Sequence, residues 1–424
     1  MPARPLTDET LRQVREQLVV LFRAGLSRVH GRQCVSTYLQ ANRPSGPTAV
    51  IATGKAACDM LAGVMDIMAD ELCAGLVISP PGQAMAGGCE DRRITHIRGN
   101  HPVPGEDSLA AGRQLLDFIN RLPAECHLLF LVSGGTSSLL EVPAEGIGLA
   151  ELQAVNRWLL ASGLDIGQMN RVRFTLSQIK GGQLHRFLGG RACTALLLSD
   201  VPGDEAGNIG SGLLHPALSL LPLPDGLPDW VRRLAERHRP GVSGACAADC
   251  HIIGNNRAAL DAIVAHAQQQ GIHATIQDEP LGGDAEVMAA RIAAQLRVAK
   301  PGICLWGGET TVRLPASPGT GGRNQQLALA VATHLAGYRP AVLLAAGTDG
   351  RDGCSEAAGA VIDSCTVERG ERCGLQAADC LQRADAGSFL AASDDLLITG
   401  PTGTNVMDIV IGMKLAESSD DRPV

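Results

Sequence analysis

Short apolar runs alternate with longer amphipathic stretches along almost the whole chain. The runs have the length of buried strands, and the stretches have the periodicity of helices that cover a sheet. We expect strands at 48–53, 75–79, 94–98, 128–132, 192–199, 250–254, 273–277, 302–306, 341–346, 395–399 and 408–413. We expect helices at 7–24, 56–69, 106–120, 149–162, 256–270, 284–298 and 324–335. This alternation predicts an α/β fold in which mostly parallel sheets are flanked by helices, with ligands beyond the carboxyl ends of the strands.

The chain is too long for one ordinary hydrophobic core. With 424 residues, it is expected to form two domains. Residues 220–230 contain three prolines and a glycine, and the strand pattern restarts at about residue 250. We therefore place the division near residue 240, with one domain over 1–240 and the other over 241–424.

Charge and cysteine content narrow the functional class. The formal net charge of −8 argues against a nucleic-acid scaffold and favours a soluble cytoplasmic protein. No apolar run approaches the roughly 18 residues of a membrane helix, and the amino terminus does not read as a secretory signal. The 13 cysteines have irregular spacing without a C-x-x-C pair, so we expect reduced thiols and neither zinc sites nor disulfides.

The segment LLFLVSGGTSSLL changes character abruptly at Ser133. An apolar run ends in Gly134 and Gly135, and three hydroxyl residues follow at an expected helix start. Free backbone N–H groups and the positive end of a helix dipole would bind a phosphate there. A tight turn capped by serine or threonine explains the same residues equally well.

Two cations stand at expected helix starts, where the helix dipole disfavours them. Lys55 lies in ATGKAA after the first strand, without the spacing of a phosphate-binding P-loop. Arg323 opens a helix after GTGG, and its guanidinium fits a carboxylate or phosphate. An anionic ligand would reverse the unfavourable dipole interaction in both places. A solvated lysine and a surface salt bridge are the simpler alternatives.

Carboxylates follow three of the expected strands. Asp200 and Asp204 lie in LSDVPGDEAGNIGSG, Asp349 lies in AAGTDGRDG, and Glu309 follows the glycine pair of WGGETT. Such groups suit a divalent cation or the acceptance of a proton. Asx turns and plain turns are the alternatives here and in TGPTGTN, at 399–405. Together, seven such loops fit a nucleotide site with phosphates, a metal and a small acid between two domains.

The motifs also resemble a known family. In chain order, SGGTSSLL, MNRVRFTLSQIKGGQL, LLLSDVPGD, GGETTV, GGRNQQLALA, AAGTDGRDG, AGAVID and LLITGPTGTNVMDIVI resemble the MOFRL-type (class II) glycerate 2-kinases, some of which are labelled hydroxypyruvate reductases. The resemblance implies ATP- and Mg²⁺-dependent phosphorylation of D-glycerate at its 2-hydroxyl, giving 2-phosphoglycerate. It also implies a Rossmann-like domain over 1–240, a MOFRL-type domain over 241–424, and an active site in the cleft between them.

In this resemblance, the family's lysine after the first strand matches Lys55, and the arginine of its GGRNQ motif matches Arg323. The acidic residues of its SDVPGD and TDG motifs match Asp200, Asp204 and Asp349. Where the family has VRKHLS, this chain has Phe174 and Thr175 in place of the Lys-His pair. We assign catalysis to Lys55, Arg323, Asp200 and Asp349, and Mg²⁺ binding to Asp200, Asp204 and Asp349. We assign nucleotide binding to Ser133, Gly134, Gly135, Thr136, Ser137, Ser138, Gly307, Gly308, Glu309, Asn324, Thr402, Gly403, Thr404 and Asn405. Which aspartate accepts the proton is left open.

An NAD(P)H-dependent hydroxypyruvate reductase is the alternative enzyme. The chain contains no G-x-G-x-x-G, which disfavours dinucleotide binding. A reductase would also need a histidine beside an acid, and neither His101 nor His215 has an obvious partner in the sequence. A catalytically inactive binding protein would be expected to lose part of the charged set. The expected small-molecule partners are D-glycerate and ATP. We expect no binding to nucleic acid or to a membrane, and a homodimer is one assembly that the chain could form.

Overall fold

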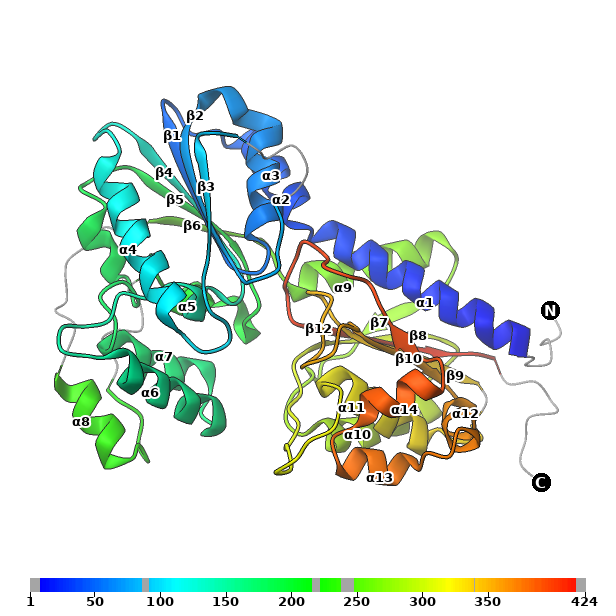
Figure 1. The fold of residues 1–424 in the computed structure, drawn as a ribbon. Helices are drawn as coiled ribbons and strands as arrows, with labels where there is room; N and C mark the ends of the chain where they lie inside the picture. Colours follow the sequence, from blue (N-terminus) through cyan, green and yellow to red (C-terminus); the bar gives the residue numbers. More distant parts are fainter. Residues whose placement is uncertain (1–7, 86–90, 216–221, 238–247, 339, 417–424) are drawn as a thin grey trace. The chain divides into compact units, whose positions relative to one another are not determined.

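The computed structural model describes residues 8–85, 91–215, 222–237, 248–338 and 340–416, and the chain forms two compact units (Figure 1). We call Val29–Asn255 with Gly403–Val406 the parallel-sheet unit. We call Met1–Arg28, Asn256–Thr402 and Met407–Val424 the mixed-sheet unit. The chain thus passes between the units at four points in its sequence.

This division corrects the predicted one. The predicted boundary near residue 240 lies within 238–247, outside the described residues, and a single boundary does not account for helix α1 (Asp8–Arg28). This helix packs against α9 (Asn256–Gln269) of the mixed-sheet unit through an apolar face that includes Leu18 and Leu21. Burial of that face explains why the amino-terminal helix belongs with the second half of the sequence.

The parallel-sheet unit confirms the predicted architecture. Its strands lie in the order β3-β2-β1-β4-β5-β6, and every neighbouring pair is parallel. The strands are β1 (Thr48–Thr53), β2 (Leu72–Ser79), β3 (Ile94–Arg98), β4 (His127–Val132), β5 (Cys193–Leu198) and β6 (Asp249–Gly254). The order reverses direction between β1 and β4, so the loops after these two strands border the crevice where such sheets bind ligands.

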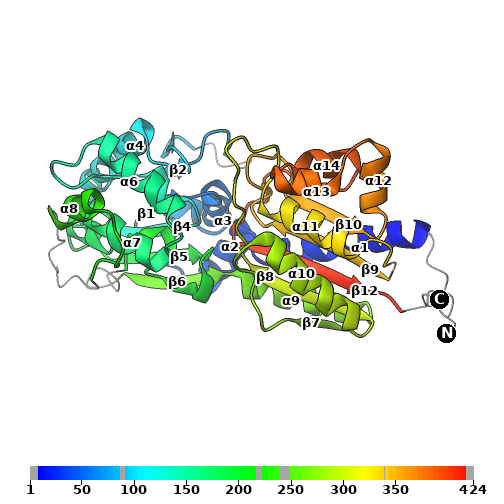
Figure 2. The same ribbon diagram turned by 90° about the horizontal axis from the view of Figure 1, so that it is seen from below.

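Helices cover both faces of this sheet (Figures 1 and 2). Helix α3 contacts β1, β2 and β4, and α4 contacts β2 and β3 from the other face. The helices are α2 (Gly31–Ala41), α3 (Ala57–Met68), α4 (Glu106–Arg121), α5 (Thr136–Leu139), α6 (Leu149–Ala161), α7 (Ile166–Thr175) and α8 (Asp229–Arg237). Because helices shield both faces, β1 is buried along its whole length, as its continuous apolar sequence predicts.

The mixed-sheet unit differs from the prediction of a mostly parallel sheet. Its order is β11-β10-β9-β12-β8-β7, in which β7 and β8 are parallel and the other neighbours are antiparallel. The strands are β7 (Ala274–Ile276), β8 (Gly302–Gly308), β9 (Ala341–Gly347), β10 (Gly359–Asp363), β11 (Leu396–Leu397) and β12 (Asp408–Lys414). Two of these antiparallel pairs involve β12, which inserts between β8 and β9 and runs against both, and the other two involve β10.

In this unit α1 and α9 lie on one face of the sheet, and α10, α11 and α14 lie on the other (Figures 1 and 2). The helices are α10 (Ala285–Val298), α11 (Arg323–His334), α12 (Thr366–Arg372), α13 (Ala377–Gln382) and α14 (Ala386–Ala392). Strand β10 and helices α12 to α14 were not predicted. They are short, so the sequence offers too few residues to establish a period.

A charged cluster is buried in the parallel-sheet unit. The ammonium group of Lys180, with no exposed side-chain surface, donates to the carboxylate of Glu141, which also accepts from the hydroxyl of Ser177 at 2.5 Å. Burial lowers the pKa of Lys180, and the Glu141 carboxylate opposes this effect. Arg173 is also buried and donates to Asn156 at 3.3 Å. The Lys180–Glu141 ion pair is therefore stable in the core only because the two charges neutralise each other.

We expect Glu141→Gln to lower the free energy of unfolding by about 3–5 kcal/mol, because Lys180 would be left buried without a counter-charge. Glu145→Gln, an exposed change four residues away, is the matched control and should change stability little. Urea unfolding of both variants at pH 7 measures the effect. Equal stability of the two variants would contradict this account of the cluster.

Candidate active site

The loops after β1 and β4 are fastened to each other. The buried hydroxyl of Ser133 accepts from the backbone N–H of Ala56 at 3.0 Å, and the N–H of Lys55 donates to the carbonyl of Gly134 at 2.9 Å. Gly54 has φ of 116°, and a Cβ atom there would lie 2.2 Å from Ser133 Oγ. These glycines therefore serve the close approach of two loops at the point where the strand order reverses.

Asp200 and Asn405 lie directly against this double loop. A Cβ atom on the buried Gly134 would lie 1.9 Å from both Asp200 Oδ2 and Asn405 Nδ2, so no larger residue fits. The Asn405 amide donates to Asp200 Oδ2 at 3.0 Å. Asp200 follows β5, and Asn405 comes from the short segment 403–406, which is distant in sequence. The fold thus brings together two predicted site residues that are separated by about half of the chain.

Lys55 and His101 lie beside Gly135. Gly135 has φ of 88°, and a Cβ atom there would lie 3.4 Å from Lys55 Cγ and 3.8 Å from His101 Cε1. The His101 ring is hydrogen-bonded to Ser138 Oγ at 2.9 Å. The partner that the structure gives His101 is thus a hydroxyl of the glycine loop.

The helix-dipole argument needs correction in both loops. Helix α3 begins at Ala57, so Lys55 precedes the helix and does not lie in its first turn. Helix α5 contains only the four residues Thr136–Leu139, and such a short helix has a small macrodipole. A phosphate bound here would depend on individual donors and on the charge of Lys55.

Several predicted nucleotide ligands hold the loops in place. Thr136 donates to the carbonyl of Ser133 at 2.8 Å, and the hydroxyls of Ser137 and Ser211 lie 2.7 Å apart. The buried Thr404 hydroxyl donates to the carbonyl of Val29 at 2.6 Å. In this conformation the hydroxyl groups of these residues bond to other parts of the protein and fix the shape of the loops.

Gly403 and Asp204, also predicted as site residues of the parallel-sheet unit, have partners of their own. Gly403 is held by the N–H of Gly31, which donates to its carbonyl at 2.9 Å. Asp204 accepts from the side chain of Asn255 at 2.6 Å, whereas Asp200 accepts from Asn405. The two aspartates thus have different amide partners.

Arg323 is the centre of a charged cluster in the mixed-sheet unit. Its Nε donates to Asp408 Oδ2 at 2.5 Å, and its Nη2 donates to Asp408 Oδ1 at 3.0 Å and to Glu309 Oε1 at 2.7 Å. The Asp408 side chain is 2% exposed and that of Arg323 is 35% exposed. Burial alone would lower the pKa of Arg323, but Asp408 and Glu309 outweigh it and raise the pKa.

Nη1 of Arg323 forms no hydrogen bond within the described residues. The guanidinium is therefore fixed on one side by two carboxylates and keeps N–H donors on the other. The predicted anionic partner of the cation at this helix start is therefore, first of all, the protein's own Asp408.

Asp408 is the residue that our reading of the sequence missed. It is the first residue of β12 and pairs with Gly308 of β8 and Gly347 of β9. Because β12 runs antiparallel to both neighbours, its first residue lies where they end. The signal in the sequence is the carboxylate at the start of the apolar run DIVIGM, a run whose pattern predicts a strand and no site residue.

The remaining predicted residues of this unit surround the same cluster. A Cβ atom on Gly347 would lie 3.3 Å from Asp349 Oδ1 and 3.4 Å from Asp408 Oδ1, so both carboxylates lie beside the end of β9. Asp349 Oδ1 also accepts from the N–H of Arg351 at 3.1 Å. Thr402 donates to the carbonyl of Thr348. Asp349 is thus placed near Arg323 through their common neighbour, Asp408.

Gly307 and Gly308 are strand residues of β8. A Cβ atom on Gly307 would lie 1.7 Å from Asn256 Oδ1, and one on Gly308 would lie 2.4 Å from the carbonyl oxygen of Leu281. Both positions therefore require glycine for packing against the protein itself. Glu309, directly after them, is the residue of this motif that reaches Arg323.

Asp352 caps helix α11 from a neighbouring loop. Its buried carboxylate accepts from the backbone N–H groups of Asn324 at 3.1 Å and Gln325 at 2.8 Å, and from the Asn324 side chain at 3.3 Å. Burial raises the pKa of Asp352 to about 6, although these N–H groups act in the opposite direction. The predicted ligand Asn324 is thus engaged by the cap.

We expect the stability advantage of the wild type over Asp352→Asn to shrink as the pH rises from about 3 to 7. The folded-state pKa of Asp352 lies above the ordinary 3.8, so the folded protein binds more protons in this window than the unfolded chain does. The contribution therefore falls by about 3 kcal/mol as Asp352 ionises. Unfolding both proteins in urea at each pH measures this difference, and a difference that grew with pH would contradict it.

The two residues that stand in place of the family's Lys-His pair lie in the core of the parallel-sheet unit. Phe174 and Thr175 end helix α7 and are buried, and a Cβ atom on Gly181 would lie 2.8 Å from the Phe174 ring. The segment is part of the core in this chain. Arg173, directly before it, donates to Asn170 at 3.3 Å.

Comparison with known proteins gives matches over nearly the whole chain. Residues 17–220 match a family described as a domain of unknown function (DUF4147), and residues 302–408 match the MOFRL family. The D-glycerate 2-kinase of Thermotoga maritima is 34% identical over 384 residues, covering 86% of this chain and 90% of the relative. The chain belongs to the glycerate 2-kinase family.

Two further comparisons extend this result. The crystal structure of the glycerate kinase from Thermotoga maritima matches with a TM-score of 0.81 at 31% identity, covering 95% of this chain and all of that one. A protein of Agrobacterium vitis that is named provisionally as a hydroxypyruvate reductase is 36% identical over 389 residues, which cover 86% of this chain and 98% of the relative. The family thus includes proteins named for two activities.

The two family matches divide the candidate residues. The DUF4147 match contains Lys55, the Ser133–Ser138 loop and Asp200, and the MOFRL match contains Arg323 and Asp408.

None of the described helices is both long and apolar enough to cross a membrane. Among the described residues there is also no group of three or more acidic, histidine or cysteine side chains that could hold a metal.

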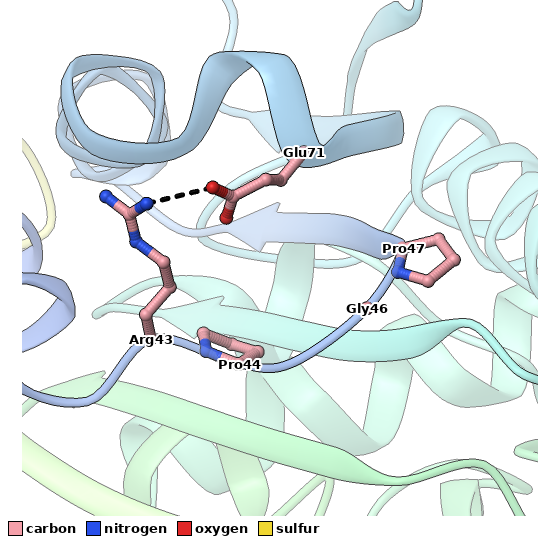
Figure 3. Close-up of a pocket in the computed structure, with 5 residues that line it drawn as sticks. All are labelled: Arg43, Pro44, Gly46, Pro47 and Glu71. Carbon is pink, nitrogen blue, oxygen red and sulfur yellow. Dashed lines mark hydrogen bonds and ion pairs between the residues drawn. The ribbon is translucent and has the colours of Figure 1, made fainter.

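The parallel-sheet unit also has a surface pocket. Arg43, Pro44, Gly46, Pro47 and Glu71 line it, and Arg43 and Glu71 form an ion pair at 2.8 Å (Figure 3). Its volume is about 390 Å³. Pro47 and Glu71 directly precede β1 and β2, so the pocket lies at the amino ends of these strands, whereas Lys55 follows the carboxyl end of β1.

Proposed function

We propose that the protein is an ATP-dependent kinase that phosphorylates the 2-hydroxyl of D-glycerate to give 2-phosphoglycerate. The observation that carries this proposal is the convergence of Lys55 and Asp200 on the Gly134–Gly135 turn, at the point where the strand order reverses. A cation and a carboxylate at a glycine turn are the groups that phosphoryl transfer needs. Membership of the glycerate 2-kinase family supports the same reaction.

The residues present fit ATP and Mg²⁺. The Gly134–Gly135 turn carries no side chain, and Lys55 stands beside it to balance phosphate charge. Mg²⁺ is usually held by one or two carboxylates together with substrate phosphates and water. Asp200 suits this role, with Asp204 and Asp349 as the other candidates, and a cluster of three protein ligands is not needed.

In the proposed mechanism, ATP supplies the phosphoryl group and Mg²⁺ balances part of its charge. Lys55 neutralises phosphate oxygens near the turn, and the Nη1 donors of Arg323 hold the transferring phosphoryl group or the glycerate carboxylate. Asp408 and Glu309 fix the orientation of that guanidinium. Asp200 or Asp349 accepts the proton of the 2-hydroxyl. Positioning and charge neutralisation then provide most of the rate acceleration.

A hydroxypyruvate reductase remains the second candidate because of two observations. The strand order β3-β2-β1-β4-β5-β6 is the one known from dinucleotide-binding sheets, and His101 has a hydroxyl partner beside the glycine turn. The loop after β1 is ATGKAA, however, and lacks the three glycines that let a pyrophosphate approach the helix. This difference favours the kinase.

We expect ADP to form only when ATP, Mg²⁺ and D-glycerate are present together. EDTA should abolish turnover and added Mg²⁺ should restore it, because the phosphates need a hard divalent cation. Chromatographic separation of ADP from ATP in quenched samples follows ADP, so that the readout itself needs no Mg²⁺. NADH with hydroxypyruvate, without any ATP, is the parallel test. NADH oxidation in that mixture without ADP formation in the first would reverse the ranking.

A further inference from the structure

Two cysteine sulfur atoms are in contact at the amino ends of the strands of the parallel sheet. Lys55 lies at the opposite, carboxyl end of β1. Cys73 Sγ and Cys126 Sγ lie 3.2 Å apart, and Cys73 Sγ also donates to the carbonyl of Thr48 at 3.3 Å. Cys73 is exposed and Cys126 is buried, and both are free thiols. Neither takes part in the proposed reaction.

A bulge explains why the two sulfur atoms meet. Cys73 lies on β2 and Cys126 directly precedes β4, and β1 lies between these strands. Residues on strands two apart are separated by about 10 Å, too far for a disulfide. In the pairing of β1 with β2, Thr48 faces Leu72 and Ala49 faces Ala74, so Cys73 is an extra residue. Such a bulge redirects a side chain, here over Thr48 toward Cys126.

We propose that Cys73 and Cys126 are a reversible disulfide pair that hydrogen peroxide oxidises. The exposed Cys73 sulfur attacks the peroxide, and the oxygen–oxygen bond breaks to give a sulfenic acid and one water. The Cys126 sulfur then attacks the Cys73 sulfur and loses its proton, and the hydroxyl leaves as a second water. Two thiols and one peroxide thus give one disulfide and two waters.

The environments of the two thiols set this order of steps. Burial and the adjacent Cys73 raise the pKa of Cys126 to about 12, so Cys126 stays protonated and is shielded from the oxidant. Cys73 is accessible to solvent. The pocket lined by Pro47 and Glu71 lies at the same end of the sheet, where β1 and β2 begin (Figure 3). Once Cys73 is oxidised, the sulfur of Cys126 is already in contact with it and needs no diffusion to reach it.

The disulfide would link the starts of β2 and β4 across β1. It would close a long loop of the unfolded chain, and we expect it to raise the melting temperature of the protein by about 5 °C. Strand β1 spans six residues, so the pair lies roughly 20 Å along the sheet from the Lys55 loop. Oxidation at this pair alone should therefore leave turnover nearly unchanged.

The test uses the full-length protein treated with increasing hydrogen peroxide, then alkylated and digested with trypsin. We expect a linked pair of peptides, residues 56–92 with residues 122–157, whose fragments place the link at Cys73 and Cys126. Cys373→Ser is the matched control, since Cys373 is exposed in the other unit. It should retain the link, whereas Cys73→Ser and Cys126→Ser should each abolish it. Dithiothreitol should reverse the link and the shift in melting temperature.

Oxidation of Cys73 to a sulfinic or sulfonic acid while Cys126 remains alkylatable would overturn the proposal. A link from Cys126 to another cysteine would overturn it as well. Cys73→Ser changes an exposed residue, so its melting temperature before oxidation shows that the variant is folded. Its failure to gain stability on oxidation is the second, independent readout.

Discussion

Replacing Arg323 by lysine is expected to lower kcat/KM for D-glycerate by roughly 10²-fold or more while the protein remains folded. The guanidinium is held by Asp408 and Glu309 through Nε and Nη2, which leaves the Nη1 donors for an anionic substrate group. Lysine keeps the charge but cannot contact two carboxylates and a third anion in a fixed plane. Steady-state kinetics together with the melting temperature measure the two effects separately.

The matched control for this variant is Arg257→Lys. Arg257 lies in the same unit and pairs with Asp261 at 2.9 Å on the exposed surface of α9, so its replacement should change neither activity nor stability by much. Near wild-type kcat/KM in Arg323→Lys would mean that the Asp408 pair is structural only. A variant that lost activity only in proportion to the folded fraction would lead to the same conclusion.

Lys55→Met should reduce kcat/KM by between about 10² and 10³, because the charge beside the Gly134–Gly135 turn would be lost and its shape largely kept. Lysine occurs at only four positions in this chain, which are Lys55, Lys180, Lys300 and Lys414. Lys300 is exposed, so Lys300→Met is the matched control and should behave as the wild type. The kinetic constants should be measured with ATP and with D-glycerate varied in turn.

The dependence on each substrate distinguishes the roles of Lys55. If Lys55 neutralises ATP phosphates, its loss should raise KM for ATP as well as lower kcat. A change confined to KM for D-glycerate would move Lys55 from the phosphate side to the carboxylate of the acid. Wild-type behaviour in both series would show that the lysine is only solvated, which is the simpler interpretation of ATGKAA.

Periodicity was sufficient to predict most elements that carry the site. Strand β1 has the bounds expected from its apolar run, and β4 begins one residue earlier than expected. The reason is that strands buried on both faces have continuous apolar sequences, which polar loops interrupt sharply. The same sharp change drew attention to the Ser133–Ser138 loop, where the fold places Lys55, Asp200 and Asn405.

The pairing of distant segments could not be predicted in this way. Nothing in the sequence DIVIGM specifies that β12 inserts between β8 and β9, yet this insertion determines that Asp408 meets Arg323. Likewise, the amphipathic pattern of α1 indicates a buried face but not which unit buries it. Strand order and helix packing depend on tertiary contacts, and a local period contains no information about them.

The measurement that tests the central proposal most directly is the phosphorus NMR spectrum of a reaction with ATP, Mg²⁺ and D-glycerate. Phosphorus on the 2-oxygen couples to the single C2 proton and gives a doublet, whereas phosphorus on the 3-oxygen couples to two C3 protons and gives a triplet. We predict a new phosphomonoester doublet that grows as ADP forms. A triplet would contradict the assignment to the 2-hydroxyl, and the absence of any new phosphomonoester would contradict the kinase itself.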